Sequence, residues 1–338
     1  MWNEILGHKQ NKEFLKQVFQ EQKTNSALLF YGPSGIGKNL MAKRFAQSFL
    51  CHNHKEENDG CPSCKAFAIN SHPDFIEVKQ VLSDKDKEKK KTDARGKFIV
   101  IDQIKEMAKQ AVYAPTLSPN KVCVIDAADF MTEEAQNSLL KLLEEPPEFW
   151  TFILVATDIN KLLPTILSRT IKVRFDNLEF SEVAQILKEQ ALPEADVLAE
   201  LAEGSPGRAL YIDSLGALEA RENVLGVLDA LPNKGVVNFV KNLDWLDKIP
   251  KQNAQLTLEL LELLLRDGLF VKEKLNDKVV NKDVLFRLEK IFAPWDSKQI
   301  KESFALTNKA YKAVTQDVGG KSVIETLIIE MNELWKEG

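Results

Sequence analysis

A glycine-rich turn followed by a lysine, near the start of the chain, has the residue types and spacing to bind phosphate. An apolar run ending at Phe30 predicts a buried strand, and Lys38 opens a segment with helical periodicity. Gly32, Gly35 and Gly37 lie between them. Glycines let backbone N–H groups point inward around an anion, and the helix N-terminus adds the positive end of its dipole. We therefore expect Lys38 to reach the terminal phosphates of a nucleotide. A glycine-rich turn without a ligand is the alternative.

The metal-binding part of this motif departs from the usual pattern at two positions. Ser or Thr normally follows the lysine and ligates Mg²⁺, but this chain has Asn39. An amide oxygen is an unusual ligand for a cation that prefers carboxylate, hydroxyl, phosphate and water oxygens. A second apolar strand ends in Asp126, which could hold Mg²⁺ through water, but Ala127 follows where a catalytic glutamate could sit. Together the two departures predict a site that holds phosphates and does not hydrolyse them.

Three other polar residues are candidates for a nucleotide site. Thr157 follows the apolar strand 151–156 and could contact a γ-phosphate, or it could cap the strand end. Arg208 follows two glycines and could reach a nucleotide, or it could be an exposed arginine at a helix start. Arg169 stands just before a short predicted strand, where a lone arginine would normally be a surface charge.

Three of the four cysteines gather in one segment, which predicts a metal site before a disulfide. Cys61 and Cys64 form a Cys-x₂-Cys pair, and Cys51 lies ten residues upstream. So few cysteines fit a reducing compartment. No apolar run approaches the ~20 residues of a membrane span, and the N-terminus lacks the pattern of a signal peptide. We therefore expect a cytoplasmic protein with no membrane contact.

The chain length and pattern predict an α/β domain followed by helices. Over 1–175, buried strands alternate with helices, which predicts a parallel sheet covered on both faces, and this domain includes the cysteine loop 51–72. Residues 176–216 predict a small helical domain, and 217–338 predict long amphipathic helices whose leucine stripes form a core. The net charge of −5 provides no global basic field for nucleic acid. The charged segment 84–97 predicts a solvated loop, with a DNA-touching basic tip as the alternative.

Several stretches resemble the clamp-loader branch of the AAA+ ATPases. The segment 135–147 resembles the family helix that ends in Leu-Glu-Glu-Pro-Pro, and 166–170 resembles its Ser-Arg-Cys motif, with Thr170 in place of Cys. The opening 5–10 resembles the part that packs near the adenine, and 204–208 resembles the second sensor. The resemblance implies an AAA+ P-loop domain with a parallel sheet, a small helical lid and an all-α collar.

At Asn39 and Ala127, where the chain departs from the motif, it is similar to the family members that are not motors. The resemblance implies a subunit without independent catalysis, in a hetero-pentamer with γ/τ and δ subunits that opens the sliding clamp and places it on primed DNA. Arg169 would project into the ATP site of a neighbouring γ/τ subunit, and the altered pocket of this chain would hold ATP or ADP. Two alternatives stay open: an active ATPase motor of the γ/τ type, and an AAA+ protein outside replication.

The resemblance also bears on the cysteines. Relatives carry four cysteines in this loop, so one ligand is missing here, and His52 or His54 could replace it because imidazole suits Zn²⁺. A zinc site and a degenerate, metal-free loop are both open.

Overall fold

The computed structural model divides the chain into two compact units, Met1–Glu182 and Val183–Gly338. It describes all residues except 1, 3–4, 22–26, 54–59, 83–96, 193, 234–250, 317–318 and 335–338. The charged segment expected to be a loop therefore lies outside the described residues up to residue 96, and so does His54. Among the described helices, none combines the length and apolar character needed to cross a membrane.

The first unit is organised around a parallel sheet of five strands in the order β2-β5-β6-β1-β7. The strands are β1 (Ala27–Tyr31), β2 (Phe75–Val78), β5 (Lys121–Ile125), β6 (Trp150–Ala156) and β7 (Ile171–Arg174). Every residue of the central strands β5 and β6 is buried, because helices cover both faces of the sheet. The edge strand β7 buries only Val173. This arrangement confirms the predicted parallel sheet. A separate antiparallel pair joins β3 (Val81–Leu82) to β4 (Lys97–Phe98).

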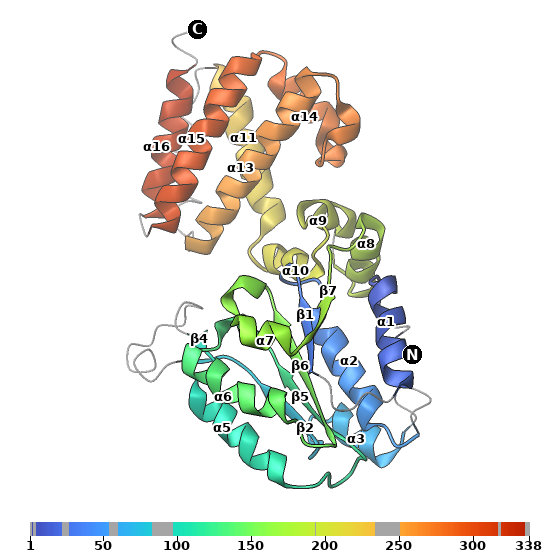
Figure 1. Cartoon of the computed structure of the whole chain (residues 1–338). Coiled ribbons are helices and arrows are strands. Elements are labelled where there is room, and N and C mark those ends of the chain that lie inside the picture. The colour runs from blue at the N-terminus through green and yellow to red at the C-terminus, as the bar shows by residue number, and fades with distance from the viewer. Residues whose placement is uncertain are drawn as a thin grey trace. The chain divides into compact units, whose positions relative to one another are not determined.

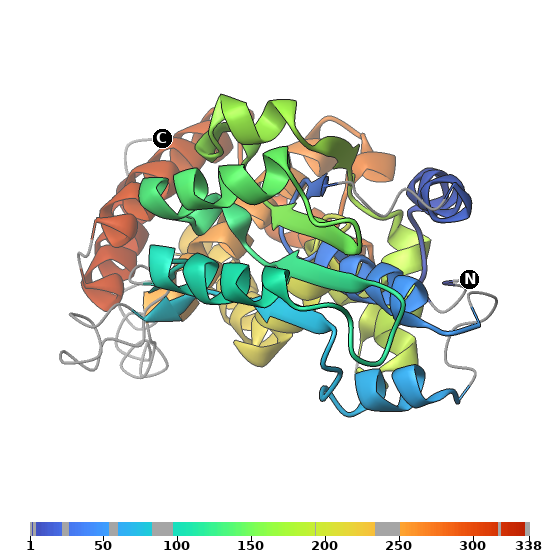
Figure 2. The same cartoon turned by 60° about the horizontal axis from the view of Figure 1, so that its bottom comes forward.

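Helices lie on both faces of this sheet (Figures 1 and 2). One face carries α1 (Lys9–Gln20), α2 (Lys38–Leu50) and α3 (Pro62–Ala68), and the other carries α5 (Ile101–Lys109), α6 (Glu133–Glu144) and α7 (Pro164–Ser168). Short 3₁₀ turns lie after α5, β5 and β6, at Gln110–Val112, Ala128–Phe130 and Ile159–Lys161. Neighbouring residues of β1 serve the two faces: Leu29 joins the core beneath α5 and α6, whereas the ring of Phe30 lies 6.5 Å from that of Phe45 in α2. The alternation follows from the two-residue period of a strand.

Local signals in the sequence set the ends of α6. The hydroxyl of Thr132 accepts a hydrogen bond from the backbone N–H of Ala135, so Thr132 is the N-cap of α6. Regular helix ends at Glu144, just before the proline pair 146–147, because proline can neither donate the next hydrogen bond nor fit against the preceding turn.

The second unit is helical throughout its described part, as the change of pattern after residue 176 predicts. Helix α8 (Phe180–Glu189) begins in the last residues of the first unit. The other helices are α9 (Ala195–Leu201), α10 (Pro206–Ser214), α11 (Ala217–Ala230), α13 (Lys251–Lys272), α14 (Leu285–Phe292), α15 (Ser297–Thr315) and α16 (Gly320–Glu333), with 3₁₀ turns at Leu231–Asn233, Asn276–Lys278 and Lys282–Val284. The predicted leucine stripe of α13 is buried in a core shared with α11, α14, α15 and α16.

A buried ionic network lies at one end of this helical core. The guanidinium of Arg221, with a side chain only 5% exposed, donates to both carboxylate oxygens of Asp283 at 3.0 and 2.8 Å and to the amide oxygen of Asn281 at 3.2 Å. The fully buried carboxylate of Asp267 accepts the backbone and side-chain N–H groups of Asn281 at 2.9 and 2.8 Å. Asn281 therefore links the arginine of α11 to the aspartate of α13.

Candidate nucleotide site and cysteine cluster

A cavity of about 440 Å³ lies beside the carboxyl ends of β1, β5 and β6. This edge of a parallel sheet is where α/β proteins usually bind ligands. Six residues that the sequence singles out line the cavity: Gly35, Gly37, Lys38, Asn39, Asp126 and Thr157. Residues that sequence reasoning did not select, Gln80 and Phe130 among them, line it as well. The fold thus brings together residues that lie far apart in the sequence.

The backbone of the glycine-rich turn explains why glycine is needed at its ends. Gly32 has φ +145°, and a Cβ atom there would lie 2.1 Å from the carbonyl oxygen of Phe175. Gly37, at the N-terminus of α2, has φ +95°, a conformation that L side chains rarely adopt, although a Cβ atom would meet no atom within 4 Å. The first glycine is therefore required by close packing and the last by backbone conformation.

The ammonium group of Lys38 is held within the turn. It donates to the carbonyl oxygen of Gly32 at 2.7 Å and also to that of Pro33, and the residue is 6% exposed. Burial lowers the pKa of Lys38, whereas the carboxylates of Asp129 and Asp126 act in the opposite direction. A buried cation enclosed by carbonyls at the bottom of a cavity is suited to an anionic ligand.

The side chain of Asn39 is turned toward the acid at the end of β5. Its Nδ2 donates to Oδ2 of Asp126, and its Oδ1 is buried without a hydrogen-bond partner among the described residues. The amide therefore presents hydrogen atoms, not oxygen, to the carboxylate that would help to hold Mg²⁺. Hydrogen atoms in that position repel a cation, so these residues do not fit the Mg²⁺ site that the motif implies.

Sequence reasoning missed Asp129, which lies near Lys38. It is 6% exposed, its Oδ2 accepts the backbone N–H of Asp158 at 3.1 Å, and its carboxylate raises the pKa of Lys38. The available signal in the sequence was that Asp129 is an acid three residues after Asp126, which follows β5. The acid lies in the 3₁₀ turn Ala128–Phe130 and does not itself line the cavity.

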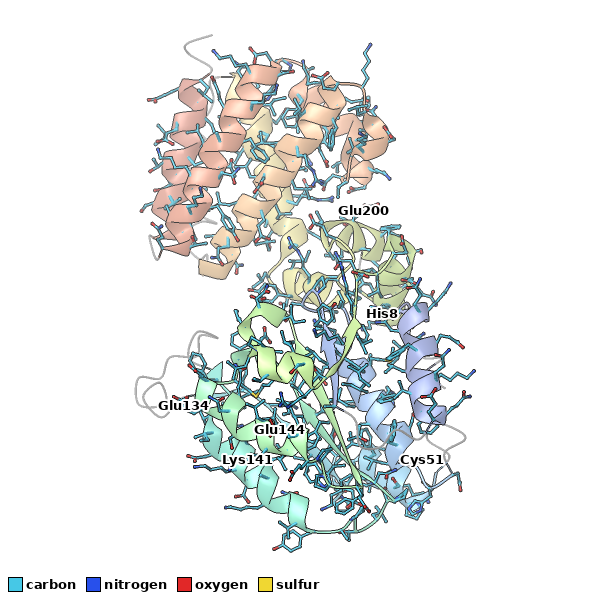
Figure 3. The ribbon with its side chains drawn as sticks, viewed as in Figure 1. His8, Cys51, Glu134, Lys141, Glu144 and Glu200 are labelled. Carbon is cyan, nitrogen blue, oxygen red and sulfur yellow. The ribbon has the colours of Figure 1, made fainter. Side chains whose placement is uncertain are left out.

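His8 is joined to the phosphate-binding turn. Its Nε2 lies 2.7 Å from the carbonyl oxygen of Ile36, and its ring packs edge-on against Phe175 with 4.9 Å between centroids. Burial lowers the pKa of His8 despite the opposing effect of the Ile36 contact. The neutral ring must donate through Nε2, because a carbonyl oxygen can only accept. The N-terminal segment that resembles the adenine-side opening is thus joined to the turn through His8, whose position Figure 3 marks.

Arg169 lies at the C-terminal end of α7 and does not line the cavity. Its Nη2 is 2.7 Å from Oε1 of Glu144, the last residue of α6, whose position Figure 3 marks. Its Nη1 donates to the carbonyl oxygen of Thr165 at 3.1 Å and to Oγ of Ser168 at 3.3 Å. The side chain is 35% exposed. The guanidinium is therefore oriented by neighbouring groups yet accessible from outside the chain.

Arg208 belongs to the second unit. It lies in the first turn of α10, where Oγ of Ser205 accepts its backbone N–H at 3.2 Å, and its guanidinium pairs with Glu259 of α13 at 3.1 Å. The expected contact of Arg208 with a nucleotide stays a prediction.

The three predicted thiols do come together. The sulfur atoms of Cys51, Cys61 and Cys64 all lie within 4.8 Å of one another. Tetrahedral Zn²⁺ with Zn–S bonds of about 2.3 Å needs sulfurs roughly 3.8 Å apart, so small shifts would suffice. Burial raises the pKa of the Cys64 thiol to about 12, and hydrogen bonds with Cys61 and Cys51 act in the same direction. His52 is not part of the cluster, and no fourth ligand occurs among the described residues.

Beside this cluster, a buried hydrogen-bond group, here called the His72 clamp, holds both ends of the cysteine loop. The hydroxyls of Ser63 and Ser118 donate to the carbonyl oxygen of Leu50 at 2.5 and 2.6 Å, and both lie within 3.1 Å of Nε2 of His72. Nδ1 of His72 accepts the backbone N–H of Asp74 at 3.1 Å, so Nε2 carries the proton of the neutral ring. Burial lowers the pKa of His72.

The carboxylate of Asp74 extends this clamp to the segment before β5. It accepts the backbone N–H groups of Thr116, Leu117 and Ser118 at 2.7, 2.7 and 2.8 Å. Sequence reasoning did not predict this role, because the partners of Asp74 lie more than forty residues away.

Fold and site together define a P-loop α/β protein. The family described as "DNA polymerase III, delta subunit" matches residues 7–179, slightly more than half of the chain. The chain therefore belongs to the DNA polymerase III delta subunit family. This result confirms the predicted resemblance to clamp-loader subunits, in particular to those named delta'.

Three curated relatives illustrate the similarity. The chain is 28% identical to DNA polymerase III subunit tau of Bacillus subtilis over 79% of this chain and 46% of tau. It is 30% identical to subunit delta' of Pseudomonas aeruginosa over 59% of each chain, and 25% identical to subunit delta' of Bacillus subtilis over 95% of each. The aligned part thus spans less than two thirds of the first two of these relatives.

Proposed function

We propose that this chain is a delta'-type subunit of a DNA polymerase III clamp loader that binds nucleotide without hydrolysing it. Its partners would be γ/τ and δ subunits in a hetero-pentamer, together with the sliding clamp and primed DNA. A cytoplasmic location suits this role. The observation that carries the proposal is a phosphate-binding turn of this family whose metal-ligand position holds Asn39 bonded to Asp126.

Native mass spectrometry of the assembly purified from cells tests the partners. We expect this chain in a complex with other clamp-loader subunits, with its bound nucleotide and metal visible in the same spectrum. Recovery of the chain with unrelated proteins only would favour an AAA+ role outside replication.

The lack of hydrolysis is tested on the purified chain alone. The amide of Asn39 opposes a cation, and Ala127 leaves the position after Asp126 without a base. We expect ATP turnover at background, equal in wild type and Lys38→Ala. Turnover well above background that disappears in Lys38→Ala would instead favour a motor of the γ/τ type.

We further propose that Arg169 acts in trans on a neighbouring ATP site. Arg169 does not line the cavity of its own chain and is partly exposed, and both observations support this role. The proposed helical lid, 176–216, and collar, 217–338, would place the chain in the ring, with Arg208 of the lid reaching the nucleotide of its own chain.

The cysteine cluster is proposed to hold Zn²⁺ through Cys51, Cys61 and Cys64, with a structural role. Its support is the proximity of the three sulfurs and the softness of thiolate ligands. Elemental analysis of the purified chain should find zinc, and Cys64→Ser should reduce the zinc content and the melting temperature. Cys123→Ser is the matched control, since that cysteine lies alone in β5 and burial raises its pKa. A chain purified without zinc that melts as the zinc-treated chain does would support the metal-free alternative.

A further inference from the structure

The side chain of Asn39 occupies the place where a P-loop protein normally presents an oxygen ligand to Mg²⁺. Its Nδ2 donates to Oδ2 of Asp126, and both residues line the cavity. Turning the amide over would set its Oδ1 against the carboxylate, where two acceptors repel each other and the hydrogen bond is lost. The orientation of the amide is therefore determined by the acid, and Asn39 presents its N–H group, not its oxygen, to the carboxylate.

The same hydrogen bond reduces the repulsion between the carboxylate of Asp126 and a phosphate, as a cation would. A bare carboxylate at the end of β5 would repel the phosphates of a nucleotide, and Mg²⁺ normally lies between the two. Here the amide of Asn39 donates to one oxygen of the carboxylate, while Lys38 and the backbone N–H groups of the turn supply the positive potential. The cavity has the components of an anion site but lacks a place for the metal.

We infer that this cavity binds a nucleoside diphosphate without Mg²⁺, with the amide of Asn39 in place of the cation. The inference rests on the proposed nucleotide site and specifies its ligand. The diphosphate is favoured because a γ-phosphate would add negative charge in the cavity that the carboxylate of Asp126 lines, with no metal between them. A site occupied by a diphosphate would also hydrolyse no ATP, because the ligand has no γ-phosphate.

Isothermal titration of the purified full-length chain with ADP and with ATP, each in excess MgCl₂ and in EDTA, tests the inference. For wild type we expect the Kd of ADP to change less than about threefold between the two buffers, and ATP to bind at least about tenfold more weakly than ADP in EDTA. Asn39→Thr restores a hydroxyl ligand, so in this variant Mg²⁺ should tighten ATP binding by about tenfold or more. Lys38→Ala should abolish binding in both buffers, and thermal melts verify that each variant is folded.

Three results would overturn the inference, and they differ from one another. Wild-type binding that tightens about tenfold in Mg²⁺ would refute metal independence while leaving the nucleotide site intact. ATP binding as tightly as ADP in EDTA would refute the preference for the diphosphate. Failure of both nucleotides to bind folded wild type in either buffer would refute the nucleotide site itself, and with it that part of the proposed function.

Discussion

Replacement of Arg169 by alanine should separate the folding of this chain from its action on a neighbour. The pair with Glu144 is short, at 2.7 Å, but the two side chains are 35% and 47% exposed. An exposed pair of this kind contributes about 0.2–1 kcal/mol, so the isolated variant should unfold with nearly the wild-type free energy. An arginine supplied in trans to a phosphoryl-transfer site contributes about 10³–10⁵ in rate, which corresponds to about 4–7 kcal/mol at that site.

The assay is DNA-stimulated ATP hydrolysis by a clamp loader reconstituted from purified subunits. We expect a complex with Arg169→Ala to assemble and to lose hydrolysis at the adjacent site. Arg169→Lys should rescue it poorly, because an ammonium lacks the planar fork of the guanidinium. Glu144→Gln breaks the same ion pair but keeps the arginine, so it should retain most of the activity. Wild-type hydrolysis with Arg169→Ala, or an equal loss with Glu144→Gln, would refute the reasoning.

Three stability predictions follow from buried groups, each measured by chemical denaturation of the isolated chain. Arg221→Met should lower the free energy of unfolding by about 2 kcal/mol, because it leaves the buried amide oxygen of Asn281 and the partly exposed carboxylate of Asp283 without their donor. Loss of the exposed Arg287–Glu222 pair in Arg287→Ala should cost less than about 1 kcal/mol. Gly32→Ala should cost about 2 kcal/mol or more, since its Cβ would meet the backbone of Phe175, and Gly37→Ala, which has free space, should cost less. Because burial lowers the pKa of His72, the unfolded chain binds its proton more readily; stability should therefore fall as the pH drops below about 6.5, and less so in His72→Gln. An equal pH slope in the variant would contradict this assignment.

The fold was largely predictable because its signals are local. Apolar runs of strand length, the glycines before Lys38 and the proline pair after Glu144 each determine a neighbouring element, and a parallel sheet follows from their alternation. The same rules place Asp126 at a strand end, beside the phosphate-binding turn. These local rules cannot predict how a side chain is oriented once two elements that are distant in the sequence pack together.

The site contains the details that the sequence did not reveal. That Asn39 is a poor magnesium ligand was evident from its chemistry, but its hydrogen bond to Asp126 depends on how α2 packs beside β5. Asp129 was missed because it sits in a 3₁₀ turn after the strand, where the pattern gives no periodic signal. The clustering of the cysteines was predicted from their spacing, whereas the hydroxyls of Ser63 and Ser118 that support their loop carry no motif.

The His72 clamp has a consequence for the order of folding and metal binding. Leu50 and Ser63 immediately precede Cys51 and Cys64. The carbonyl oxygen of Leu50 accepts from the hydroxyls of Ser63 and Ser118, and the hydroxyl of Ser63 also contacts the imidazole of His72. Two of the three sulfurs are thereby positioned by hydrogen bonds that involve no ion. The entropy cost of gathering the thiols is met when the α/β unit folds and not when a cation arrives. Removal of the proposed Zn²⁺ by a chelator should accordingly leave the surrounding sheet intact, unlike a zinc finger, which unfolds when its metal is withdrawn.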